Sequence, residues 1–285
     1  MYGILKAEDS SYPPFLKLIP DPPKKLFWKG SLAPELFENC LGVIGSRKMS
    51  PYGERVVEYF FSELSPKITI VSGFMYGVDA KAHKEALKRH LRTIAILPCG
   101  LDFIYPREHE NLYKNIENFG GLLISEYEGS MGPRTWTYLR RNRIVAGLSK
   151  ALLVIEASER SGSLNTAELA AMYKRDILAV PGNIFSEVSK GCLQLIKKGA
   201  KSVTSGFEIN DIMGLNKEGL FNTKTCSQTE VTKTDPIVKI LRAFPLTLDD
   251  LSTYMSIPLP ILSSKITQLC LDGSIVEEQG KFYAR

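Results

Sequence analysis

Six short apolar runs alternate with helical patterns, and this alternation constrains the fold more than any other feature of the chain. Segments of helical periodicity such as ERVVEYFFSEL (54–64) and VDAKAHKEALKRHL (78–91) lie between the runs. Near-continuous apolar strands are typical of a parallel sheet covered on both faces. We therefore predict an α/β fold, an extended Rossmann-like, doubly wound and mostly parallel sheet. The runs are LGVIG (41–45), ITIVSG (68–73), TIAILP (93–98), GLLISEY (121–127), ALLVIEA (151–157) and ILAVPG (177–182).

Changes in composition divide the chain into four segments. Residues 1–36 are proline-rich and are expected to form an arm packed on the core, and residues 37–215 form the Rossmann-like domain. Residues 216–235 are polar and lack periodicity, which is typical of a linker. Residues 236–285 show three short helical patterns and then SIVEEQGKFYAR, which predicts a hairpin that turns at Gln279-Gly280. Three helices followed by a hairpin predict a small C-terminal winged-helix domain.

Composition excludes several classes of protein. No apolar segment approaches the roughly 18 residues of a membrane span, so no membrane partner is expected. The start, MYGILKAEDSSYPPF, carries charges where a signal peptide needs an apolar core. The five cysteines are scattered and form no CxxC pair, which is typical of reduced thiols. These features predict a cytoplasmic protein without a metal site or a cofactor.

The positive charge of the chain is unevenly distributed. The formal net charge is +5, but residues 226–285 carry six Lys and Arg against seven Asp and Glu. The excess of cations therefore lies in residues 1–225. If a polyanion binds, this distribution directs it to the larger region and away from the tail.

Three predicted strands end in loops rich in serine and glycine, and the carboxyl ends of parallel strands meet at one edge of a sheet. A strand-to-helix turn exposes backbone N–H groups and the positive end of a helix, which suits a phosphate. Each loop by itself is equally typical of a capped turn, but three at one edge predict an anion site. The loop residues are Gly45, Ser46 and Arg47 after the first run, Ser72 and Gly73 after the second, and Arg160, Ser161, Gly162, Ser163 and Thr166 after the fifth.

The stretch TWTYLRRNRIVAGLS (135–149) gathers arginines and aromatic rings on a predicted helix. Arginines that hold phosphates beside rings that stack on bases are typical of sites for single-stranded nucleic acid. A solvated basic helix face has the same composition and stays an open alternative. Asn142 favours the site, because asparagine is a poor residue within a helix unless its side chain has a bonding partner. The candidate residues here are Tyr138, Arg141, Asn142 and Arg143, whereas Arg140 is ambiguous and Trp136 is expected in the core.

Two titratable residues, Asp79 and His83, follow the second run. Asp79 lies at the start of the helical segment 78–91, where a carboxylate stabilises a helix N-terminus. His83 lies one turn later and could pair with it. Without a neighbouring serine or cysteine nucleophile, we interpret such a pair as structural.

Six motifs, taken in order, resemble the DprA/Smf family, the DNA-processing proteins of natural transformation. The resemblance runs from about Tyr12 to Gly206 and implies a Rossmann-like core that binds single-stranded DNA, protects incoming DNA, forms a homodimer and helps to load a RecA-type recombinase, without catalytic turnover. By position, it implies a DNA pocket built from the strand-end residues and the arginine stretch named above. The motifs are GSRKMSPYG, SGFMYGVD, LPCGLDFIYPREHENL, RRNRIVAGLS, EASERSGSLNTAELA and AVPGN…KGCLQLIKKGA.

The chain departs from the family pattern at a few positions. Leu139 stands where the family usually has proline, Met75 where a small residue is common, and Cys192 where asparagine is common. Many members also carry an additional N-terminal helical domain, which is not expected ahead of the YPPFLKLIPDPP segment.

Two rival functions remain from the residues. SGSLNTAE is similar to the PGGxGTxxE loop of the lysine decarboxylase-like nucleotide phosphoribohydrolases, with Glu168 in the place of their acid, but it lacks the paired glycines. A duplex-DNA regulator would read DNA with the tail, yet the expected recognition helix, LPILSSKITQLC, offers only Lys265 as a cation. No GxxxxGK[ST] motif supports ATP hydrolysis.

Overall fold

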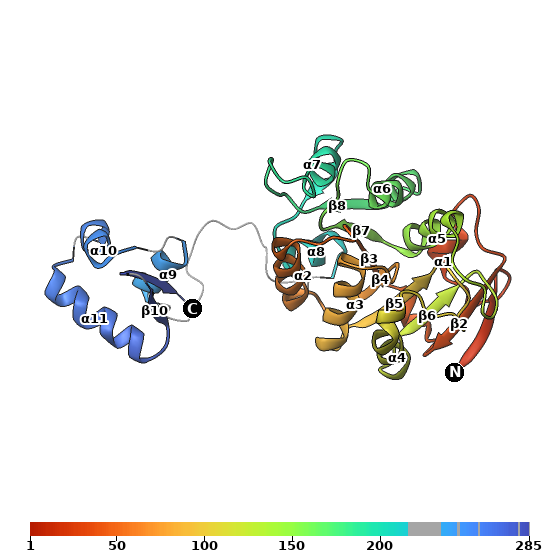
Figure 1. Cartoon of the computed structure of the whole chain (residues 1–285), viewed down its shortest axis with the longest axis horizontal. Helices are drawn as coiled ribbons and strands as arrows, with labels where there is room; N and C mark the ends of the chain where they lie inside the picture. The colour runs from red at the N-terminus through yellow and green to blue at the C-terminus, as the bar shows by residue number, and fades with distance from the viewer. Residues whose placement is uncertain (216–234, 244–245, 256, 279, 285) are drawn as a thin grey trace. The chain divides into compact units, whose positions relative to one another are not determined.

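The computed structural model describes residues 1–215, 235–243, 246–255, 257–278 and 280–284. The chain forms two compact units, Met1–Leu220 and Phe221–Arg285 (Figure 1). All but the last residue of the predicted linker, 216–235, lies outside the described residues. In the part of the chain that is described, no helix is both long and apolar enough to cross a membrane.

A nine-stranded mixed sheet forms the centre of the first unit (Figure 1). Seven adjacent strands are parallel, and β1 and β2 add to one side of them as antiparallel strands. All six apolar runs form strands, so the predicted mostly parallel α/β sheet is confirmed. Across the sheet, the order is β1 (Tyr2–Lys6), β2 (Lys25–Gly30), β6 (Leu122–Ser125), β5 (Arg92–Leu97), β4 (Thr69–Ser72), β3 (Cys40–Ile44), β7 (Ala151–Val154), β8 (Asp176–Ala179) and β9 (Lys201–Ser202).

The order of the parallel strands reverses between β3 and β7. Strands β3, β4, β5 and β6 follow one another in one direction, and β7, β8 and β9 follow in the other. Loops that leave neighbouring strands toward opposite faces open a crevice at such a reversal, and α/β sheets bind ligands there.

Helices cover both faces of the sheet. Alternation along each strand sends successive side chains to opposite faces, so Ile44 joins the cluster under α5 and α6 while Val43 joins the cluster under α2 and α3. The helices of this unit are α1 (Pro14–Lys17), α2 (Pro51–Glu63), α3 (Val78–Lys88), α4 (Glu110–Asn118), α5 (Thr135–Leu148), α6 (Gly162–Met172), α7 (Lys190–Lys197) and α8 (Gly206–Ile212), with 3₁₀ turns η1 (Pro34–Phe37) and η2 (Arg107–His109).

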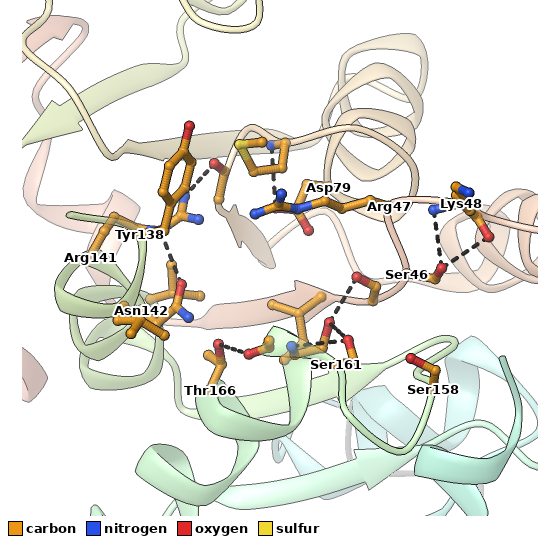
Figure 2. Close-up of a pocket in the computed structure, with 18 of the residues that line it drawn as sticks. Ser46, Arg47, Lys48, Asp79, Tyr138, Arg141, Asn142, Ser158, Ser161 and Thr166 are labelled. Atoms are coloured by element: carbon orange, nitrogen blue, oxygen red, sulfur yellow. Dashed lines mark hydrogen bonds between the residues drawn. The ribbon is translucent and has the colours of Figure 1, made fainter. Parts of the chain in front are cut away.

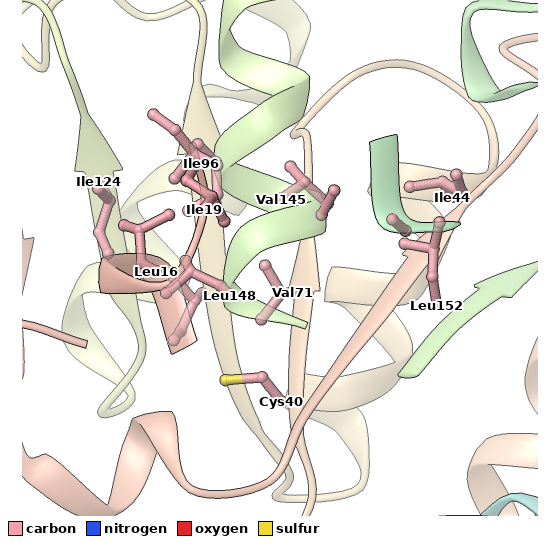
Figure 3. Packing of buried hydrophobic residues seen from close by; sticks show 14 of the residues in the cluster. Leu16, Ile19, Cys40, Ile44, Val71, Ile96, Ile124, Val145, Leu148 and Leu152 are labelled. Carbon is pink, nitrogen blue, oxygen red and sulfur yellow. The ribbon is translucent and has the colours of Figure 1, made fainter. Parts of the chain in front are cut away.

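Residues 1–36, predicted as an arm packed on the core, contribute the two strands β1 and β2 to the sheet itself. β1 and β2 pair with each other, and β2 pairs with β6. Five of the prolines fall between the two strands, where the absent N–H groups cost no ladder hydrogen bonds. In the segment of chain that connects β1 to β2, Leu16 and Ile19 are buried beside Leu148 of α5 (Figure 3). Their side chains lie so close to Gly147 that a Cβ there would meet Leu16 Cδ1 at 2.7 Å.

In its described residues, the second unit contains three helices and a two-stranded antiparallel sheet. Their buried side chains, among them Ile237, Leu251, Leu262 and Phe282, form a separate hydrophobic cluster. The predicted hairpin turn is Gln279-Gly280, of which Gln279 lies outside the described residues; Gly280 has φ +76, a conformation that suits glycine. The elements are α9 (Pro236–Ala243), α10 (Leu248–Met255), α11 (Leu259–Leu271), β10 (Ile275–Glu278) and β11 (Lys281–Ala284).

Candidate nucleic-acid interface

A pocket of about 490 Å³ lies at the carboxyl ends of β3, β4 and β7, at the reversal of strand order. Loops after β3 and β4, the middle of α5 and the start of α6 form its walls. Figure 2 shows Arg47 on one side of the pocket and Ser161 and Thr166 on the opposite side. Most of the predicted DNA-binding residues line this pocket: Gly45, Ser46, Arg47, Gly73, Tyr138, Arg141, Asn142, Ser161, Gly162, Ser163 and Thr166.

The start of α6 presents its positive end to the pocket. Ser161 is the N-cap residue, and its hydroxyl accepts a hydrogen bond from the Ser163 amide at 3.2 Å. The Ser163 hydroxyl donates to the Gly45 carbonyl at 2.8 Å, which joins this helix end to the loop after β3. Gly162 is exposed, and a Cβ there would meet no atom within 4 Å. The first turn is therefore sterically open to an anion, which the positive end of a helix dipole favours.

Arg47 and Tyr138 form the cationic and aromatic wall. Arg47 is exposed, and its Cζ lies 5.4 Å from the centroid of the Tyr138 ring (Figure 2). Tyr105 packs edge-on against the same ring, with centroids 6.4 Å apart. Burial raises the pKa of the Tyr138 hydroxyl to about 12, so the ring is neutral at physiological pH. A fixed neutral ring beside a free guanidinium can stack on a base while the cation holds a phosphate.

Arg141 forms the floor of the pocket and is only 5% exposed. Its Nη1 donates to the carbonyl oxygens of Gly73 and Ile96, which lie at the ends of β4 and β5. Its Nε donates to the Asn142 side chain at 3.3 Å. An asparagine within a helix was expected to have a side-chain bonding partner, and Arg141 is that partner. Arg141 therefore ties two strand ends to α5 and contributes positive charge from below the pocket.

Asp79 lies opposite Arg141 in the pocket wall and is 8% exposed. Burial raises the pKa of the Asp79 carboxyl, and the positive charge of Arg141 opposes that rise. Its Oδ2 accepts the Met75 amide at 3.3 Å, in the manner of a carboxylate that stabilises a helix start. The possible pair with His83 does not form, because the His83 ring bonds the Thr93 hydroxyl at 2.7 Å between α3 and β5.

Three predicted residues do not line the pocket. Ser72 is fully buried and donates to the Val43 carbonyl at 2.6 Å, which joins β4 to β3. Arg143 is buried on the far side of α5, where its Nη2 lies 2.7 Å from Glu126 Oε1. Arg160 is exposed in the loop before α6 and lies outside the lining. Trp136, expected in the core, is 46% exposed.

The pocket also contains residues that the sequence did not single out as binding residues. Lys48 and Ser158 extend its polar rim, and Met75, Leu139 and Val188 supply apolar wall. Lys48 could have been identified as a binding residue from the sequence, since it directly follows Arg47 in the same strand-end loop. Val188 could not have been identified from the sequence, because its place at the pocket depends on a tertiary contact, in which its carbonyl oxygen accepts a hydrogen bond from the Ala157 amide at 2.7 Å.

An open, mostly parallel sheet with a cation-lined pocket at its strand-order reversal is the arrangement of α/β proteins that bind ligands at the carboxyl ends of their strands. The family model described as DNA recombination-mediator protein A matches residues 3–214. This chain belongs to that family, the DprA/Smf DNA-processing proteins, as the motifs predicted.

Curated relatives and solved structures agree with this assignment. The chain is 42% identical over 201 residues to DNA processing protein DprA of Streptococcus pneumoniae, covering 70% of this chain and 71% of the relative. It is 43% identical over 209 residues to Protein Smf of Escherichia coli, covering 73% of this chain but 56% of that protein.

Two solved structures resemble the first unit. The X-ray structure of DprA from Streptococcus pneumoniae superposes with a TM-score of 0.70 at 40% identity, over 74% of each chain. The structure of DNA processing protein A from Helicobacter pylori superposes with a TM-score of 0.64 at 31% identity, over 74% of this chain and 94% of that one. The latter is described as giving insight into the single-stranded DNA binding mode of the Helicobacter protein.

Proposed function

We propose that this protein binds single-stranded DNA across the strand-end pocket, with little sequence preference. Arg47 and the start of α6 hold phosphates, and Tyr138 stacks on a base. The observation that carries the proposal is the exposed Arg47 guanidinium 5.4 Å from the Tyr138 ring, opposite an open helix N-terminus. The single-stranded DNA binding described for the Helicobacter pylori relative supports it.

Binding without chemical turnover is the mode of action that the pocket favours. Its one acidic lining residue, Asp79, faces Arg141 and accepts a backbone N–H. Glu168, which would be the acid of a phosphoribohydrolase, lines a separate groove with Arg175 and Lys198. This placement argues against the rival enzyme, and release of free base from nucleoside monophosphates would revive that rival.

The family assignment extends the proposal to partners. On this basis we propose that the protein forms a homodimer, protects incoming DNA and helps to load a RecA-type recombinase. Three helices and a two-stranded antiparallel sheet support a winged-helix domain for residues 236–285. Because residues 236–285 carry five Lys and Arg against five Asp and Glu, and so no net positive charge, this domain is proposed to contact protein rather than DNA.

Fluorescence anisotropy with an oligo-dT strand of about twenty residues tests the site. In Arg47→Ala, the Kd should rise about tenfold, and the slope of log Kd against log salt should fall by about 0.7, because one phosphate contact is lost. Arg55→Ala removes an exposed arginine of α2 outside the pocket and is the matched control. Equal effects of the two substitutions would refute the site.

Tyr138 is tested separately by two substitutions. Tyr138→Phe keeps the ring and should leave the Kd within about twofold, whereas Tyr138→Ala should weaken binding by about 1–3 kcal/mol. If Phe and Ala weaken binding equally, the ring does not stack on a base.

A further inference from the structure

A second groove of about 490 Å³ lies between the end of α3, the start of β5 and the end of α4. Its floor is apolar and consists of Leu87, Leu91 and Leu112, of which Leu91 and Leu112 are nearly buried. Phe119, which follows α4 directly, borders the groove and is 74% exposed. Exposed aromatic rings beside an apolar hollow are typical anchors of protein interfaces.

Cations rim this groove. Lys84, Lys88 and Arg92 are exposed and contribute three positive charges, and His90 lies between them. The described residues that line the groove come from three elements, and none of them is acidic. Lys88 Nζ lies 3.8 Å from Glu85, but that carboxylate is buried and already accepts a hydrogen bond from Arg89 at 2.9 Å.

The helix dipole does not account for this cluster. A lysine in the last turn, such as Lys88, is favourable at the negative end of a helix. However, the carbonyl oxygens in the last turn of α3 already accept hydrogen bonds from the residues that follow the helix. The Leu91 amide donates to the Ala86 carbonyl oxygen at 2.8 Å, and the His90 amide donates to the Leu87 carbonyl oxygen at 3.1 Å. Arg92 lies beyond the helix in β5, and Lys84 lies one turn before its end. The charges therefore point to a ligand outside the helix.

We propose that this groove binds an acidic segment of a partner protein that places one bulky apolar side chain on the leucine floor. Carboxylates of the segment lie against the lysine and arginine rim, and the anchor packs between the floor and Phe119. A peptide fits better than a nucleic acid, because single-stranded nucleic acid sites use several stacking rings on a polar track. Here the groove has two rings, Phe119 and His90, and its floor consists of three leucines rather than a polar track.

The groove and the DNA pocket lie at opposite ends of α3. Asp79, in the first turn of α3, lines the DNA pocket, and Lys88, its last residue, lines the groove. At a rise of about 1.5 Å per residue, an 11-residue helix separates its ends by about 16 Å. A partner segment in the groove is therefore compatible with DNA in the pocket.

Anisotropy of a fluorescein-labelled peptide, with aspartates flanking a Leu-Phe pair, tests the proposal on the full chain. The acidic peptide should bind, and counterparts with asparagines for the aspartates, or alanines for Leu-Phe, should bind about tenfold more weakly. The double variant Lys84→Gln/Lys88→Gln should raise the peptide Kd about fivefold. Phe119→Ala should raise it about tenfold.

The matched control is Lys6→Gln/Lys67→Gln, which removes two exposed lysines outside the groove. This control should change the peptide Kd less than about twofold, and all variants should keep their oligo-dT affinity. Equal loss in the control and groove variants would overturn the proposal, as would competition between the peptide and oligo-dT. Loss of oligo-dT affinity in Lys84→Gln/Lys88→Gln would identify the groove as a nucleic-acid site instead. Failure of the acidic peptide to bind would also overturn the proposal and would leave the Arg47 result intact, so the two sites are tested independently.

Discussion

Arg143 is predicted to stabilise the fold rather than to hold DNA. The sequence places Arg141 and Arg143 in the same basic stretch, but Arg143 is 6% exposed and forms ion pairs outside the pocket. Its Nη2 lies 2.7 Å from Glu126, and its Nε lies 3.3 Å from Asp21. Substitution by methionine keeps the aliphatic stem and removes the charge.

The magnitude follows from what remains after the substitution. Removing one partner of a buried ion pair costs about 3–5 kcal/mol, because the other charge stays buried. Glu126 keeps a second cation, Arg140 Nη2 at 3.2 Å, and this reduces the loss. We therefore expect Arg143→Met to destabilise the protein by about 2–3 kcal/mol. For a unit of this size, the melting temperature should fall by about 8 °C.

Differential scanning calorimetry and oligo-dT anisotropy on the same samples decide the question. Arg140→Met is the matched control, since Arg140 pairs with the same carboxylate but its side chain is 51% exposed. This control should cost less than about 1 kcal/mol. Below the melting temperature, Arg143→Met should keep the salt dependence of DNA binding. A smaller thermal shift than in the control, together with a reduced salt slope, would refute the reasoning and return Arg143 to the DNA site.

Three further predictions concern the first unit. Gly77 has φ +71 and a Cβ there would meet the Arg47 carbonyl oxygen at 2.7 Å, so Gly77→Ala should cost about 3 kcal/mol in urea unfolding. Gly120→Ala, at φ +80 with open space, should cost only about 1 kcal/mol, and equal costs would contradict the close approach. Burial lowers the pKa of His83 from 6.5 to about 3, so the unfolded state binds more protons between these values, and stability falls as the pH is lowered through this range. The loss from about pH 7 to 5 should be about 2 kcal/mol and should shrink in His83→Gln. Burial raises the pKa of the Cys40, Cys99 and Cys192 thiols to about 12, so a thiol reagent should modify them only on unfolding, as mass spectrometry of native and denatured samples will show.

Patterns close together in the sequence determined the framework of this protein. Period and length identify strands and helices locally, so the six apolar runs predicted the parallel strands and their shared edge. Ser50 and Ser161 cap α2 and α6, and such a cap is likewise local because it depends on residues within one turn. The strand-end loops followed from these assignments, which is why Gly45, Arg47 and Gly162 could be placed together.

Tertiary packing decided which members of each motif reach the pocket. Arg141 and Arg143 are two residues apart on α5, so their side chains leave the helix in nearly opposite directions. Arg141 meets Gly73 and Ile96, whereas Arg143 meets Glu126 and Asp21, and all of these partners are distant in the sequence. The second groove depends likewise on α3, β5 and α4 meeting in space. A local pattern fixes the direction of a side chain relative to its helix, and only the packing of that helix on the sheet fixes what the side chain contacts.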